Sequence, residues 1–134
     1  MSFAGVFVVF LVSHHVGDYL LQTDWQARNK SGGLRRGAGE SRRALFAHVG
    51  TYGLAFVPAL AWLATETGAG IAVGLGVLVV VPHLVVDDGR LLRTHLRAVK
   101  HVTDPIDPTL RATVDQSMHL VSLFAVAVLG AALS

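Results

Sequence analysis

The sequence contains no cysteine, and charged residues make up only 15% of its 134 residues. The missing cysteine excludes disulfides, iron–sulfur clusters, thiolate metal sites and cysteine nucleophiles. A soluble domain usually carries about 25% charged residues, whereas here 52% of the residues are apolar and the mean hydropathy is positive. This balance excludes a disordered chain, a coiled coil and a nucleic-acid-binding module. It indicates one small domain that lies in a membrane.

Basic residues are absent from most of the chain. All 11 Lys and Arg residues fall in two segments, Arg28–Arg43 and Arg90–Arg111, and four mostly apolar runs of 18–22 residues remain outside them. Each run approaches the ~20 residues that a helix needs to cross a bilayer, and none alternates like a membrane β-strand. We therefore predict an all-α membrane protein, a four-transmembrane-helix bundle forming a single integral membrane domain over residues 1–134. The predicted spans are Ser2–Gln22, Ala44–Thr65, Ala69–Val86 and Asp115–Leu133.

The positions of the basic segments predict how the bundle lies in the membrane. The short connection Glu66–Gly68 carries no basic residue, so both basic segments fall on one side of a four-span protein. The positive-inside rule assigns that side to the cytoplasm. Both termini are then external, and the protein is a multi-pass protein of the cell (inner) membrane. The first span is expected to be retained, because it has His14, His15 and Asp18 where a signal peptide has a small-residue cleavage site.

The second basic segment has the pattern of an interfacial helix between the third and fourth spans. From Arg90 to Val102, Leu92, Leu96 and Val99 recur at helical spacing, and the basic side chains fall on the opposite side. Such an amphipathic helix lies on the inner leaflet, where anionic head groups attract it. The expected partners are therefore membrane lipids and not nucleic acid, and a homo-oligomer is compatible with the sequence.

Ionisable side chains lie within the apolar spans, where each costs about 2.5–3.5 kcal/mol and so needs a partner or a function. Three His–Asp pairs are spaced i, i+4, which places both members on one face of a helix. When residues are counted inward from the basic end of each span, such groups from all four spans fall in one layer, roughly 5–12 Å below the inner membrane surface. Histidine and aspartate on facing helices predict a site for two divalent cations, which suits Zn, Mn or Fe rather than Cu(I). The predicted ligands are His14, Asp18, His48, His83, Asp87, Asp115 and His119.

A second interpretation of the same residues needs no metal. The three pairs would then be His–Asp hydrogen bonds that hold the helices together. Hydrogen bonds between membrane helices contribute about 0.6 kcal/mol on average and about 1.7 at most, which is little against the cost of burying the groups. We favour the metal site, since ionisable residues inside a membrane usually serve a function.

Four motifs follow one another along the chain: His14-x-x-x-Asp18-Tyr-Leu-Leu-Gln-Thr-Asp-Trp with Lys30 after it, then His48, His83-x-x-x-Asp87, and Asp115-Gln116-x-x-His119. In this order they resemble a small bacterial multi-pass membrane family of unknown function, over essentially the whole chain. One departure is Arg90, where the resemblance predicts a lysine. That family is distantly similar to damage-inducible membrane proteins described as metal-dependent hydrolases, which implies a hydrolase by analogy.

Several functions fit such a site. The preferred prediction is an intramembrane metal-dependent hydrolase that acts on a lipid or phosphoester at the cytoplasmic membrane interface, with Asp88 or Asp24 as the general base. The alternatives are a di-iron membrane oxidoreductase and a transporter or sensor of a metal ion or proton. Transport is less favoured, because the outer halves of the spans lack ionisable residues. A non-catalytic scaffold would leave the polar layer without a role.

Overall fold

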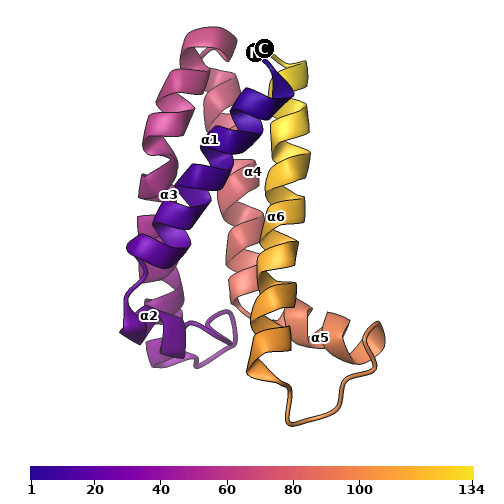
Figure 1. Cartoon of the computed structure of the whole chain (residues 1–134). Coiled ribbons are helices and arrows are strands. Elements are labelled where there is room, and N and C mark those ends of the chain that lie inside the picture. The colour runs from indigo at the N-terminus through magenta and orange to yellow at the C-terminus, as the bar shows by residue number, and fades with distance from the viewer.

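The computed structural model describes residues 1–134, and its regular elements are all helices (Figure 1). Four of these segments are long and apolar enough to span a membrane: α1 with its continuation η1, α3, α4 and α6. The predicted all-α four-helix bundle is therefore confirmed. The elements are α1 (Phe3–His15), the π-helical turn η1 (Val16–Leu20), α2 (Asp24–Asn29), α3 (Gly39–Thr67), α4 (Ala69–Asp87), α5 (Arg90–Ala98) and α6 (Pro108–Ala132).

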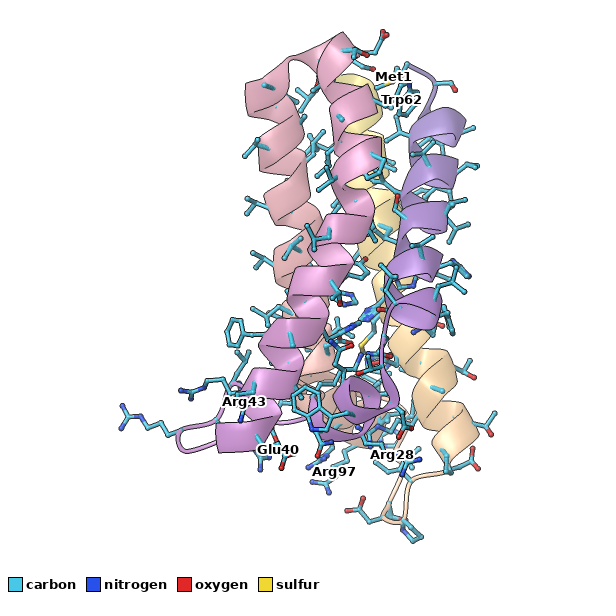
Figure 2. The ribbon with its side chains drawn as sticks, turned by 90° about the vertical axis from the view of Figure 1, so that its left-hand side faces the viewer. Met1, Arg28, Glu40, Arg43, Trp62 and Arg97 are labelled. Carbon is cyan, nitrogen blue, oxygen red and sulfur yellow. The ribbon has the colours of Figure 1, made fainter.

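The two ends of the bundle differ in charge. Both termini meet at one end, where the Met1 ammonium donates a hydrogen bond to the Ser134 hydroxyl at 2.7 Å (Figure 1). The short helices α2 and α5 lie at the other end, where Figure 2 shows Arg28, Arg43 and Arg97. We term this the basic end of the bundle. As predicted, the two basic segments share one side of a four-helix arrangement.

Apolar side chains from all four long helices fill the middle of the bundle. Phe10 of α1 and Phe56 of α3 pack edge to face, with ring centroids 5.8 Å apart. The outer faces are apolar as well, since Leu54, Val73 and Val121 are 68%, 67% and 70% exposed. A bundle with apolar side chains both inside and outside is suited to lipid surroundings. The buried core comprises Val6, Phe10, Tyr52, Phe56, Ala59, Leu63, Leu75, Val79, Leu123, Val126 and Ala127.

Helices α3 and α6 extend beyond the predicted spans at the basic end. α3 begins at Gly39 instead of Ala44, and α6 begins at Pro108 instead of Asp115. The prediction counted only apolar residues, whereas a helix can continue past the hydrocarbon if its end is capped. At α6 the Asp107 side chain accepts a hydrogen bond from the Leu110 amide at 2.8 Å, and proline stands at the first helical position.

The predicted amphipathic helix is present as α5 but is shorter than expected. It ends at Ala98 and not at Val102, because the chain turns back and His101 adopts a left-handed φ of 54°. Its apolar side, Leu92 and Leu96, is buried against Val114 of α6. This packing fixes α5 across the basic end of the bundle.

Candidate metal centre

Each of the long helical segments contributes histidine or aspartate side chains to one layer near the basic end. Asp18 lies on η1, His48 on α3, His83 and Asp87 on α4, and Asp115 and His119 on α6. Five of these six residues are buried, and Asp115 is half-buried. We term the six the His/Asp cluster. The structure thus joins side chains that stand up to 101 residues apart in the sequence, between positions 18 and 119.

Four members of the cluster form a first ligand group, Asp18, His48, His83 and Asp87, in which one nitrogen or oxygen of each lies within 4.8 Å of the others. The Nε2 atoms of His48 and His83 are 2.9 and 3.0 Å from Asp87 Oδ2. They are 3.2 and 3.5 Å from Asp18 Oδ1. Two imidazoles and two carboxylates are a ligand set that suits Zn²⁺ or a similar divalent cation.

A second ligand group, Asp87, Asp115 and His119, shares one residue with the first. His119 Nε2 lies 3.3 Å from Asp87 Oδ1, whereas Oδ2 is the Asp87 oxygen nearest to His48 and His83. The two oxygens of Asp87 therefore face different groups of nitrogen atoms. A carboxylate placed in this way could lie between two cations, and on the Oδ1 side the Lys30 ammonium is already 2.9 Å away.

Several polar atoms of the cluster have no hydrogen-bond partner although they are buried. Asp18 Oδ1, both ring nitrogens of His119 and both carboxylate oxygens of Asp87 belong to this set, although Asp87 Oδ1 lies 2.9 Å from the Lys30 ammonium. The short nitrogen–oxygen separations do not have hydrogen-bond geometry, so these groups face one another without satisfying one another. Leaving buried polar groups unpaired is costly and rare. Divalent cations in the cluster would satisfy the carboxylate oxygens and His119 Nε2, the ring nitrogen that faces Asp87, so the residues fit a divalent metal.

His14, the seventh predicted ligand, lies beside the cluster and is in neither ligand group. Its Nε2 bonds to Gln116 Oε1 at 3.0 Å, and its Nδ1 lies 3.3 Å from the Tyr52 hydroxyl. The distance from Nδ1 to Asp18 Oδ2 is 3.7 Å. The i, i+4 argument assumed a regular helix, whereas Asp18 lies in the π-helical turn η1 that follows His15; Gln116 bonds to both His14 and Asp18, and only Asp18 belongs to a ligand group.

Three residues that the sequence did not mark as ligands or partners contact the cluster. The Lys30 ammonium is 2.9 Å from Asp87 Oδ1. The Gln116 amide donates to Asp18 Oδ2 at 3.4 Å. The Tyr52 ring stacks on the His83 imidazole, with centroids 3.4 Å apart. Lys30 follows the first of the four sequence motifs and Gln116 lies in the fourth. Membership of these motifs is the only feature of the sequence that could have marked them as contacts of the cluster.

The two aspartates expected as general bases lie away from the cluster. Asp88 is buried, but its carboxylate accepts a hydrogen bond from the Leu34 amide at 2.8 Å and pairs with Arg90. It thereby ties the first basic loop to the end of α4. Asp24 pairs with Arg28 at 2.8 Å, and both side chains are 76% exposed. A catalytic role for either stays a prediction, and the geometry gives it no support.

A cavity of about 700 Å³ connects the cluster to the basic end. Its wall contains three carboxylates of the cluster, those of Asp18, Asp87 and Asp115. The same wall contains basic side chains, so an anion inside it would meet both the cluster and positive charge. We term it the metal-side cavity. The basic residues in its wall are Arg28, Lys30, Arg93 and Arg111.

Fold and site together define a multi-pass membrane protein with a buried cluster of His and Asp residues that could hold a metal ion. The chain belongs to the family described as protein of unknown function (DUF3307), which matches residues 6–134. This confirms the predicted resemblance to a family of unknown function, whereas the implied likeness to hydrolases finds no support. No curated protein and no solved structure matches the chain. The function therefore has to be argued from the site itself.

The close approach of η1 to α3 gives a first prediction about the cluster. A Cβ on Gly17 would lie 2.7 Å from the Tyr52 ring and 3.2 Å from Tyr52 Cα. Gly17→Ala should therefore push η1 away from α3, move Asp18 away from His48, and cost about 1–3 kcal/mol of stability. We expect lower metal content and a lower melting temperature. Gly50→Ala is the matched control, because a Cβ there meets nothing within 4 Å. Unchanged metal content in Gly17→Ala would contradict the close fit.

Proposed function

We propose that this protein is a metal-dependent hydrolase that cleaves a phosphoester of a membrane lipid at the cytoplasmic interface. The observation that carries the proposal is the position of Asp87. Its two oxygens face two ligand groups, and its side chain lines a cavity with basic walls. Paired cation sites next to a basic cavity are suited to phosphoryl chemistry, in which the charge of the phosphate must be offset.

The charges of the cluster support a cation there. Asp18, Asp87 and Asp115 bring three carboxylates, and Lys30 is the one Lys or Arg within ion-pair distance of them. One divalent cation would balance the remaining two negative charges. A second cation would exceed this balance unless an anion came with it. We therefore expect the first ligand group to hold a resident ion, and the second group to fill when a phosphate compound binds.

The residues of the site have separate roles in the proposed reaction. Bound divalent cations supply Lewis acidity toward the phosphoester and activate water. A water oxygen forms a bond to phosphorus, the ester P–O bond breaks, and the proton lost by the water is returned to the leaving oxygen. Asp115 is our candidate to hold that proton on one carboxylate oxygen while the other oxygen binds the second cation, because it lines the cavity and receives only one long hydrogen bond, 3.5 Å from the Gln116 amide. Lys30 would bind a phosphoryl oxygen.

The apolar core argues against the transport alternative. Beyond the cluster, toward the end with the termini, Phe10, Phe56 and Leu63 are fully buried. A path for ions or protons needs polar groups along its length. The basic cavity and the cluster both lie at one end of the bundle, as expected for a site that opens to one side of the membrane.

The orientation of the site can be tested by cysteine labelling, since the chain has no cysteine of its own. By the positive-inside rule the basic end faces the cytoplasm. A membrane-impermeant thiol reagent should therefore label Gly68→Cys and Ser134→Cys in intact cells. Gly37→Cys, in the loop between α2 and α3, should react only after the membrane is opened. Labelling of Gly68→Cys from the inside alone would place the site on the outer face.

Metal analysis tests the proposal most directly. Protein purified in detergent without chelators should carry one divalent ion per chain, and two when inorganic phosphate is added. Zn or Mn is expected, whereas Fe would favour the di-iron oxidoreductase. The loaded protein should release phosphate or alcohol from phospholipids in mixed micelles. If the wild type carries no metal above background and takes none up, the proposal is wrong.

A further inference from the structure

A second cavity adjoins the metal-side cavity at the basic end. It has a volume of about 340 Å³ and lies beside α5, between apolar side chains and three arginines, Arg93, Arg97 and Arg111. One carboxylate, that of Asp104, also lines it and pairs with Arg97 at 2.6 Å. We term it the arginine cavity. Gly89, Leu92, Arg93 and Arg111 line both cavities, so the two share a wall. A ligand that filled one could therefore extend into the other.

Two of the arginines in this cavity have no carboxylate partner. The Lys and Arg side chains that form ion pairs do so as Arg28–Asp24, Lys30–Asp87, Arg90–Asp88 and Arg97–Asp104. Arg93 and Arg111, the two in the shared wall, form none. A guanidinium group presents paired donors that match phosphate oxygens, which makes arginine the preferred residue for binding phosphate. The shared wall therefore offers two free phosphate-binding groups.

The packing around the shared wall fixes the backbone that carries these two arginines, whose side chains are exposed. A Cβ on Gly89 would lie 3.7 Å from Arg111 Nη2, so the guanidinium group rests close to this glycine at the corner between α4 and α5. Gly89 itself has a left-handed φ of 77°, which favours glycine. Arg93 is carried by α5, whose neighbouring residues Leu92 and Leu96 are buried against α6. Both side chains thus start from a fixed backbone.

We infer that the substrate carries a second phosphate next to the one that is cleaved, as a lipid diphosphate does. The inference rests on the proposed function and names its substrate class. The phosphate bonded to the lipid alcohol would lie in the metal-side cavity beside the His/Asp cluster, where water adds to its phosphorus, the ester P–O bond breaks, and the lipid alcohol and pyrophosphate are released. The second phosphate would lie in the arginine cavity, bound by Arg93 and Arg111. A lipid with a single phosphate would leave these two groups without a ligand.

Binding of inorganic pyrophosphate and orthophosphate to the metal-loaded full chain in neutral detergent tests this inference by calorimetry. Pyrophosphate should bind at least about tenfold more tightly than orthophosphate. Arg93→Gln and Arg111→Gln should each weaken pyrophosphate binding about tenfold and change orthophosphate binding less than about threefold. Arg93→Lys should recover only part of the loss, because lysine keeps the charge and lacks the paired donors. Melting curves would confirm that each variant is folded.

Two controls separate a specific site from the general positive charge of this end. Arg36→Gln and Lys100→Gln remove the same charge, and neither residue lines either cavity. If these variants weaken pyrophosphate binding as much as Arg93→Gln does, or if pyrophosphate binds no better than orthophosphate, the inference is wrong. Orthophosphate binding that depends on metal would leave the proposed function standing in that case. If no phosphate binding depends on metal, the inference and the proposed function are both wrong.

Discussion

Asp87→Ala is expected to abolish metal binding at both ligand groups, because its two oxygens face one group each. Asp115→Ala should instead spare the ion of the first group, since Asp115 belongs only to the second. Metal analysis of the purified variants should show no bound ion in Asp87→Ala and one in Asp115→Ala. Hydrolysis should fall about 1,000-fold or more in Asp87→Ala, since the Lewis acidity of the metal is worth several kcal/mol.

The neighbouring residue provides a matched control for this prediction. Asp88 is also buried and negatively charged, but its carboxylate bonds to the Leu34 amide and to Arg90. Asp88→Ala should therefore keep its metal and lose about 1–3 kcal/mol of stability, because the Leu34 amide is left without a partner. Equal metal loss in the two variants would mean that the end of α4 unfolds in both. The shared-ligand interpretation would then be wrong.

Most of the cluster could be predicted from the sequence because burial in lipid makes polar residues conspicuous. A histidine in a soluble domain attracts little notice, whereas His48 lies alone in an apolar run and requires an explanation. The apolar runs also set the depth of each residue, and depth was enough to bring residues of four spans to one layer. For the same reason the four-helix architecture followed from hydropathy and from the positions of the basic residues.

The contacts that depend on irregular backbone could not be predicted in this way. The π-helical turn η1 sets the position of Asp18 relative to His14, which bonds to Gln116 and lies beside Tyr52, and no periodicity in the sequence signals that turn. Lys30 reaches Asp87 only because α2 lies across the basic end, in a region without an apolar pattern. Hydrophobic patterns describe the part of a chain that lies in lipid, whereas the walls of the two cavities are formed mostly outside it.

Removal of the metal is expected to lower the melting temperature by about 10 °C or more. An ion present at 1,000 times its dissociation constant stabilises the folded state by about 4.1 kcal/mol, and 1 kcal/mol shifts the melting temperature of a domain of this size by a few degrees. Without the ion, Asp18 and Asp87 remain buried with Lys30 as their one Lys or Arg partner. The measurement is thermal unfolding in detergent, before and after treatment with a chelator and again after metal is restored.

The double variant of His83 and Asp87 separates this prediction from the interpretation in which His–Asp pairs merely join helices. In that interpretation a chelator has no effect on the wild type. There His83→Ala costs about 1–3 kcal/mol, and adding Asp87→Ala costs more, because His48 and Lys30 then lose the carboxylate that each has at 2.9 Å. If the cluster binds metal, the chelator lowers the melting temperature of the wild type. It has no effect on the single variants or on the double variant, because each has lost ligands that the ion requires. Since the two interpretations differ already in the wild type, the chelator response decides between them even if a variant fails to fold.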